Sequence, residues 1–150
     1  MGFWHNVLRD IMEGKGSDPP PCVRALAFDR SVKLTKWEDG AAWVRWEADP
    51  QFCNGSGAIF GGYICAVADI VADFTMMTIH RDDQVHATTD LRMSFFRPLM
   101  PGPIDVSGRL ITKNRTSAHV EVEFKDAGGK LCAKASLVEA FLQFPPPQTT

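Results

Sequence analysis

The sequence predicts an α+β fold in which a curved antiparallel sheet wraps around one apolar helix. Residues 62–79 are apolar on nearly every side, and strand-like segments rich in Val, Leu, Phe and Thr precede and follow them. A helix without a polar face has to be covered almost all round, which a strongly curved sheet achieves. At 150 residues with 45% hydrophobic side chains and no break in composition, the chain is expected to build one core.

The N-terminus is expected to form a short amphipathic helix that docks onto this core. Apolar residues recur there at helical spacing and end before Gly14: Phe3, Trp4, Val7, Leu8, Ile11 and Met12. Residues 17–21 end in three consecutive prolines, which indicates a linker. We therefore divide the chain into an N-terminal helix and linker (residues 1–21), a main domain (residues 22–144) and a flexible Pro-rich tail (residues 145–150).

Strands are expected on both sides of the apolar helix. Residues 23–35 and 41–47 alternate apolar and polar side chains around Glu38-Asp39-Gly40, which is typical of a hairpin. After the helix, four further segments have strand character: residues 85–96, 104–112, 117–126 and 131–144. The last three are expected to form an antiparallel meander.

The glycine-rich segment 54–62, which leads directly into the apolar helix, carries the strongest functional signal. Glycines let the backbone approach a ligand closely, and a helix that starts at Gly61-Gly62 directs its unpaired N–H groups and positive dipole end toward that ligand. About two turns further on, Asp69 lies among Ala, Val and Ile, where an ionised side chain is costly. The pattern indicates an oxyanion site beside a buried acid. The alternative is a glycine turn before an ordinary core helix, with Asp69 at a solvated edge.

Composition narrows the partners and the compartment. The net charge of −2 and the scattered basic residues argue against a nucleic acid partner. The four cysteines are far apart without a C-x-x-C pair, so neither a zinc knuckle nor a disulfide framework is expected, and a reducing cytoplasm fits best. The histidines are widely separated, so we assign no metal and no cofactor. The N-terminus lacks the apolar core of a secretory signal, and no segment has the length of a membrane span.

A set of motifs resembles the hotdog-fold thioesterases of the PaaI-like group, over roughly residues 24–144. The matching positions are Asn54, Gly57, Phe60-Gly61-Gly62, Asp69, Thr88-Thr89-Asp90, Phe95-Phe96-Arg97-Pro98, Gly102, Arg115-Thr116-Ser117 and the segment 126–133. The resemblance implies a hotdog fold and hydrolysis of an acyl-CoA, with a medium-chain or aromatic acyl group. It also implies a homodimer or homotetramer, in which the acid of one protomer faces the glycine loop of its neighbour.

The resemblance assigns roles to individual residues. Asp69 is the general base or nucleophile, Gly61 the backbone oxyanion donor, and Asn54 and Thr88 orient the thioester and the attacking water. Residues expected to bind the substrate are Phe60, Gly62, Arg97, Asn114, Arg115 and Thr116. For Asn114 and its neighbours, contact with the phosphates of coenzyme A competes with a plain polar hairpin loop.

Phe60 departs from the family pattern, because it replaces the histidine at the start of the helix. A phenyl ring neither donates nor accepts the hydrogen bonds of an imidazole, whereas donation from the Gly61 backbone survives the change. Two functions therefore stay open: an acyl-CoA thioesterase, and a non-catalytic acyl-CoA or acyl-lipid binding protein that has kept the groove.

Overall fold

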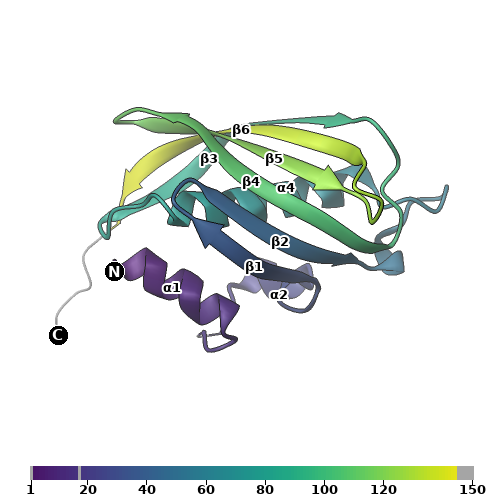
Figure 1. Ribbon diagram of the computed structural model, residues 1–150, viewed down its shortest axis with the longest axis horizontal. Coiled ribbons are helices and arrows are strands. Elements are labelled where there is room, and N and C mark those ends of the chain that lie inside the picture. Colours follow the sequence, from purple (N-terminus) through teal and green to yellow (C-terminus); the bar gives the residue numbers. More distant parts are fainter. Residues whose placement is uncertain (1, 17, 145–150) are drawn as a thin grey trace.

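A six-stranded antiparallel sheet curves around one long helix, α4 (Gly61–Met77), in the computed structural model, which describes residues 2–16 and 18–144 (Figure 1). The strands are β1 (Val32–Glu38), β2 (Ala41–Ala48), β3 (Gln84–Phe95), β4 (Gly102–Lys113), β5 (Ser117–Lys125) and β6 (Leu131–Gln143). Their order in the sheet is β1-β2-β4-β5-β6-β3, so β1 and β3 are the edges. The predicted α+β class, the apolar central helix and the meander of the last three strands are confirmed. The predicted tail, residues 145–150, lies outside the described residues.

The sheet approaches α4 closely at a glycine in the middle of β4. A Cβ atom at Gly108 would lie 3.3 Å from the Val71 methyl Cγ1 and would also collide with the Thr75 hydroxyl. Thr75 is fully buried and donates its hydroxyl hydrogen to the Val71 carbonyl. A glycine in a strand interior commonly marks such a close approach, and here it seats the C-terminal half of the helix.

A β-bulge in β3 decides which of its side chains face α4. Thr88 pairs with Glu139 of β6, but Asp90 pairs with Val138, so Thr89 is an extra residue in the ladder. Before the bulge the even-numbered residues point to the helix, and after it Leu91 and Met93 pack against the core instead. A one-residue insertion exchanges the two faces of a strand, so the polar part of β3 and its apolar part face the same helix.

The N-terminal helix α1 (Phe3–Met12) lies beside β1 and the end of α4 (Figure 1). Leu8 is fully buried, the His5 ring nitrogen Nε2 lies 2.9 Å from the Thr78 carbonyl, and the backbone N–H of Phe3 donates to Asp82 at 2.7 Å. The helix thus covers the C-terminal end of α4. Whether residues 1–21 are a separate unit from the main domain stays a prediction.

The strand predicted over residues 23–35 is wrong in its first part. Two short helices, α2 (Pro21–Ala25) and α3 (Phe28–Ser31), occupy that segment, and β1 begins only at Val32. Pro21 stands at the start of α2, where its fixed φ favours a helix and its missing N–H costs nothing. The last proline of the expected linker therefore begins a helix. A 3-10 turn, η1 (Pro50–Phe52), leads into the glycine-rich segment.

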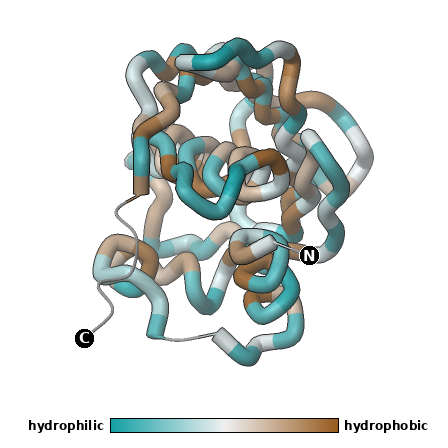
Figure 2. The backbone as a smooth tube through the Cα atoms, turned by 90° about the vertical axis from the view of Figure 1, so that its left-hand side faces the viewer, coloured by the Kyte–Doolittle hydropathy of each residue, from teal (hydrophilic) through white to brown (hydrophobic). Residues whose placement is uncertain are grey.

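Hydrophobic and hydrophilic residues alternate in short stretches along the backbone (Figure 2). Among the residues that the structure describes, no helix is long and apolar enough to cross a membrane. All four cysteines are free thiols.

Candidate active site

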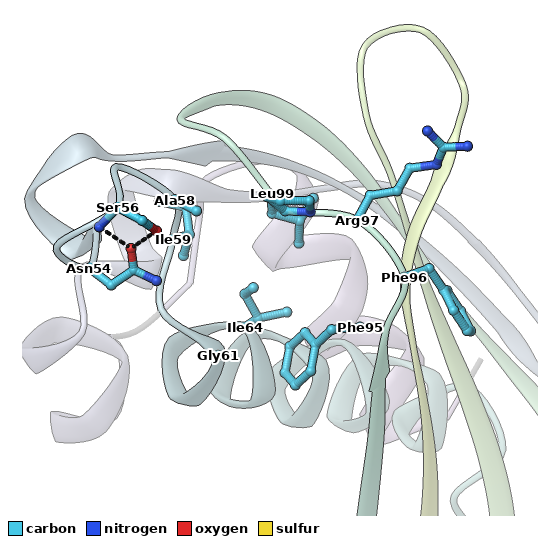
Figure 3. A pocket seen from close by; sticks show the side chains of 11 residues that line it. Asn54, Ser56, Ala58, Ile59, Gly61, Ile64, Phe95, Phe96, Arg97 and Leu99 are labelled. Carbon is cyan, nitrogen blue, oxygen red and sulfur yellow. Dashed lines mark hydrogen bonds between the residues drawn. The ribbon is translucent and has the colours of Figure 1, made fainter.

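The glycine-rich segment forms a tight loop that delivers the chain to the start of α4. Cys53 and Ile59 bridge in antiparallel fashion, and the backbone N–H of Asn54 donates to the Ala58 carbonyl at 2.7 Å. Gly57 has a φ of +87°, a left-handed conformation that disfavours side chains. Asn54 Oδ1 accepts hydrogen bonds from the backbone N–H and the hydroxyl of Ser56, at 2.9 and 2.7 Å (Figure 3). The exposed NH2 group of the same side chain stays available for a ligand.

The first turn of α4 presents backbone N–H groups between two aromatic rings. Helix geometry leaves the first N–H groups without an intrahelical acceptor, and no described residue accepts a bond from Gly61 or Gly62. A Cβ at Gly61 would lie 3.0 Å from the ring of Phe95, and one at Gly62 would lie 2.9 Å from the ring of Phe60. A Cβ at either position would therefore have to displace the exposed ring that it meets. Phe60 itself stands immediately before the helix and is 43% exposed.

A pocket of about 410 Å³ opens at this end of the helix. Its wall is mainly apolar, with a polar rim: Asn54, Ser56, Ala58, Ile59, Gly61, Ile64, Phe95, Phe96, Arg97, Pro98 and Leu99. The Phe95 ring lies over the first turns of α4, and the Arg97 side chain extends away from the loop that carries Asn54 (Figure 3). The pocket combines a backbone anion site with room for an apolar group, so three of the predicted residues, Asn54, Gly61 and Arg97, share one cavity.

A second polar cluster lies further along α4, where β3 and β6 face the helix. The Thr88 hydroxyl lies 2.7 Å from Asp69 Oδ1 and 2.9 and 3.1 Å from the two carboxyl oxygens of Glu139. Glu139 is fully buried, whereas Asp69, which was expected to be a buried acid, is partly exposed. Burial raises the pKa of Glu139 to about 7, and the charges of Asp73 and Asp69 act in the same direction. The predicted pair of Asp69 and Thr88 is thus in direct contact, together with a carboxyl group that sequence reasoning missed.

One turn further on, a pair of histidines extends the cluster. His86 Nε2 lies 2.6 Å from Asp73 Oδ1, and His86 Nδ1 lies 2.7 Å from His80 Nε2. Burial works to lower the pKa of His86, but the hydrogen bond and charge of Asp73, with the charges of Glu139 and Asp69, raise it above its ordinary value. Burial and the neighbouring His86 lower the pKa of His80 to about 4. The fold thus brings together two histidines that are separate in the sequence. Within the described ranges 2–16 and 18–144, no three His, Cys, Asp or Glu side chains are grouped to hold a metal ion.

The two clusters do not meet within one chain. Asp69 follows Gly61 by eight residues, which is about 12 Å along the helix axis. Asn114, Arg115 and Thr116, which were predicted to bind the substrate, are farther away still, in the turn between β4 and β5. Asn114 Oδ1 there accepts the backbone N–H groups of Thr116 and Ser117, and Arg115 lines a separate polar pocket with Arg81 and Gln84.

The residues that sequence reasoning missed do leave a signal in the sequence. In β6 every second residue from Ala133 to Glu139 is buried, so the alternation alone places a carboxyl group on the core face. His86 precedes Thr88 by two residues and therefore shares its face of β3. The bulge at Thr89, which sets where this face ends, has no such signal.

Comparison with known proteins agrees with this architecture. The family model described as Thioesterase superfamily matches residues 56–133, from the glycine-rich loop into β6. A protein of Saccharolobus solfataricus, provisionally named an esterase, is 36% identical over 104 residues, which cover 69% of this chain and 74% of that protein.

Several solved structures share the fold. A provisionally named thioesterase from Ralstonia eutropha, related to phenylacetic acid degradation, has a TM-score of 0.78 at 23% identity and covers 90% of this chain and 99% of its own. The PaaI protein of the Escherichia coli phenylacetic acid degradation operon has a TM-score of 0.70 at 17% identity, covering 79% and 86%. A Streptococcus mutans protein bound to acetyl-CoA has a TM-score of 0.71 at 19% identity, covering 77% and 91%.

These matches confirm the expected family and fold. The residues matched by the family model include Gly61, Asp69 and Thr88, and so span both polar clusters of α4. The chain belongs to the thioesterase superfamily, has the hotdog fold of PaaI-like thioesterases, and falls at the family level among enzymes that hydrolyse thioesters.

Proposed function

We propose that this protein hydrolyses acyl-CoA thioesters that carry a medium-chain or aromatic acyl group. The observation that carries the proposal is the start of α4, where Gly61 lines a mainly apolar pocket and the N–H groups of Gly61 and Gly62 have no acceptor among the described residues. Hydrolysis builds negative charge on the thioester carbonyl oxygen, and fixed backbone donors stabilise that charge without reorganisation. Ile59, Ile64 and Leu99 provide an apolar wall for the acyl group.

In this mechanism Asp69 activates the nucleophile. Asp69 removes a proton from a water molecule held by the Thr88 hydroxyl, and the water oxygen attacks the thioester carbon. The carbonyl oxygen becomes an oxyanion on the Gly61 N–H, and Asn54 orients the thioester. When the intermediate collapses, the carbon–sulfur bond breaks and the proton held by Asp69 passes to the coenzyme A sulfur. Direct attack by the Asp69 carboxylate remains the second route to the same products.

The catalytic groups require a second copy of the chain, because Gly61 and Asp69 are about 12 Å apart along one helix. Strand β3 is an unpaired sheet edge, and the exposed Phe60, Phe95 and Phe96 lie near its end. If two β3 edges pair antiparallel about Leu91 and Arg92, residue 88 of one copy lies beside residue 95 of the other. The Asp69–Thr88 pair of each copy then faces the Gly61 pocket of its neighbour.

The same two-fold pairing gives Arg115 a role. Arg115 lies at the Gln84 end of β3, whereas Arg97 lies at the Phe95 end. When the two β3 edges pair antiparallel, the Gln84 end of one copy lies next to the Phe95 end of the other. Arg97, Asn114, Arg115 and Thr116 then meet around one site and bind the phosphates of coenzyme A. A homodimer is the smallest assembly with this arrangement, and a tetramer adds a second pair. The reducing cytoplasm, where acyl-CoA is made and used, is the compartment that suits this activity.

A non-catalytic acyl-CoA or acyl-lipid binding protein is the second candidate. It is favoured by Phe60, whose ring occupies the position of the family's histidine and offers the thioester no hydrogen bond. The site then keeps the pocket and the anion donors, but it lacks one polarising group.

A panel of acyl-CoA substrates, assayed by release of free thiol, decides between the two candidates. We expect saturable release for medium-chain or aromatic acyl groups, from a protein that light scattering shows at twice the 16.6 kDa chain mass or more. Acyl-CoA binding in calorimetry without thiol release supports the second candidate. A protein that neither binds nor hydrolyses any member of the panel contradicts both, and hydrolysis by a monomer contradicts the shared site.

A further inference from the structure

Glu139 is an ionisable side chain inside the core, at a position where a leucine or valine would be ordinary. It lies in β6 between Ala118 of β5 and Thr88 of β3, and its exposed fraction is 0%. An isolated buried carboxylate is costly, and such groups keep a proton or find a strong donor. The Thr88 hydroxyl is the hydrogen-bond partner of Glu139 among the described residues.

The Thr88 hydroxyl and the two carboxyl groups beside it carry too few hydrogens if both acids are ionised. The Thr88 oxygen lies within hydrogen-bond distance of Asp69 and of Glu139, yet a hydroxyl group donates only one hydrogen. Two carboxylates at this oxygen would leave one close contact between acceptors without a proton. One of the two acids must therefore supply the second hydrogen.

The surroundings assign that hydrogen to Glu139. The side chains that face it from α4 are those of Asp69 and Asp73, both acidic, and those from β3 are His86 and Thr88. The residue paired with Glu139 on β5 is Ala118, whose side chain carries no charge and no hydrogen-bonding group. Burial and the two aspartates raise the pKa of Glu139 to about 7, against the opposite effects of Thr88 and His86. Asp69, by contrast, is partly exposed to water.

We propose that Glu139 is a protonated positioning residue, which donates a hydrogen bond to Thr88 and thereby fixes the Thr88 hydroxyl as a donor to Asp69. This inference rests on the proposed function, because Thr88 and Asp69 are the residues that hold and activate the water. Glu139 does not touch the substrate or the reacting atoms. Its proton sets the direction of both hydrogen bonds, so that Glu139 donates to Thr88 and Thr88 donates to Asp69.

Loss of this proton disrupts the site in two ways. The Thr88 hydroxyl then has two carboxylates as competing acceptors, so it no longer points to Asp69 alone. A second negative charge also appears beside the base, in a region of low dielectric. We therefore expect turnover to fall about tenfold for each pH unit above the titration of Glu139.

The decisive variant is Glu139→Gln, because the glutamine amide is always neutral and always a donor. We expect this variant to keep kcat near the wild-type value at pH 6 and to change by less than about twofold up to pH 9, whereas the wild type falls. Glu139→Leu, which removes the donor, should lose about tenfold at every pH. The exposed Glu47→Gln in β2 is the matched control and should follow the wild-type profile. Asp73 raises the pKa of the neighbouring His86 above its ordinary value, so the difference between Gln and wild type, not the wild-type limb alone, identifies Glu139.

A measurement without substrate separates this inference from the proposed function. Carbon-13 NMR of labelled glutamate carboxyls, with the Glu139 signal assigned by its absence in Glu139→Gln, should show titration near pH 7 instead of the usual value of about 4.3. A midpoint in the usual range overturns the inference even if the enzyme is active, as does an alkaline limb that persists in Glu139→Gln. If the wild type hydrolyses nothing, the proposed function fails while the titration alone decides whether Glu139 holds the proton. If Glu139→Gln does not fold, Glu139→Leu assigns the signal by the same absence, and the wild-type titration remains the test.

Discussion

The two halves of α4 carry opposite kinds of chemistry on one helix. The first turn offers backbone N–H groups of Gly61 and Gly62 and opens onto an apolar pocket. The middle offers the carboxylates of Asp69 and Asp73, each held by a side chain of β3. One subunit therefore keeps the proposed oxyanion donor, Gly61, apart from the proposed base, Asp69. In the proposed mechanism, neither half is a complete site.

The bulge in β3 explains how one strand serves both halves. His86 and Thr88 face the carboxylates, and after the extra residue Thr89 the odd-numbered residues face the helix, so that Phe95 lies against Gly61. Without the bulge, Asp90 and Arg92 would point into the core and Phe95 would point away. The polar and apolar ends of the site thus depend on one inserted residue.

Removing the carboxylate should have the largest effect on turnover. We expect Asp69→Asn to lower kcat by roughly a hundredfold to ten-thousandfold, the usual contribution of a positioned acid-base group, with the affinity for coenzyme A nearly unchanged. Steady-state kinetics and calorimetry check both values. Asp105→Asn, which changes a surface carboxylate paired with Arg45, is the matched control. Wild-type turnover by a folded Asp69→Asn protein would refute the role of Asp69.

Gly61→Pro should remove the anion donor at the other half while the helix stays intact. Proline is accepted in the first turn of a helix, and Phe60 already has the extended backbone (φ −70°, ψ 146°) that a residue before proline prefers. The matched control is Gly61→Ala, which adds the same Cβ near Phe95 but keeps the N–H. We expect kcat for the proline variant to be about a hundredfold to a thousandfold below that of the alanine variant. Equal rates for the two variants would exclude the Gly61 N–H as the oxyanion donor.

Sequence alone predicted most of the N-terminal half of α4, which carries Gly61 and Gly62 (the glycine half). It predicted only part of the half that carries Asp69 and Asp73 (the carboxylate half). Backbone chemistry follows from local order, because glycines before an apolar helix fix where the N–H groups point. The contact of Thr88 with Asp69 came from the resemblance, and Glu139 and His86 were missed because they reach the site through strand pairing. The helices α2 and α3 were missed because the apolar-polar alternation of residues 23–31 also suited a strand. The register of β3 depends on a bulge, which tertiary packing sets.

Phe60→His tests whether the glycine half works at its full rate without an imidazole. For an active wild type, we expect the rate or the acyl preference to change by about tenfold, because an imidazole can polarise the thioester beside the Gly61 donor. For a binding protein, the same change should produce slow hydrolysis from none. Free-thiol release over the acyl-CoA panel measures both cases. Phe3→His is the control, since Phe3 is a similarly exposed phenylalanine in α1 (49% against 43%). An unchanged rate and preference would show that the ring at position 60 does not affect the reaction.

The smallest expected effect is on stability, at the far end of the carboxylate half. His80 lies against Trp4 and Phe141, and burial and His86 lower its pKa to about 4, below the ordinary value of 6.5. Between these two values the unfolded chain binds a proton that the folded protein does not, so His80 makes stability fall as pH falls from 6.5 to 4.

His80→Asn should remove this part of the acid sensitivity. We expect the wild type's stability relative to the variant to decrease by on the order of 2 kcal/mol over that window, after allowance for partial exposure, which is roughly 5 °C in Tm. Glu139 acts with the opposite sign, because a raised carboxyl pKa makes stability fall as pH rises from about 4.5 to about 7. Thermal melts of wild type, His80→Asn and the exposed His119→Asn control at pH 4 to 7.5 separate the contribution of His80 to stability from that of Glu139. A Tm difference between wild type and His80→Asn that stays constant across this range would mean that the pKa of His80 is not lowered in the folded protein.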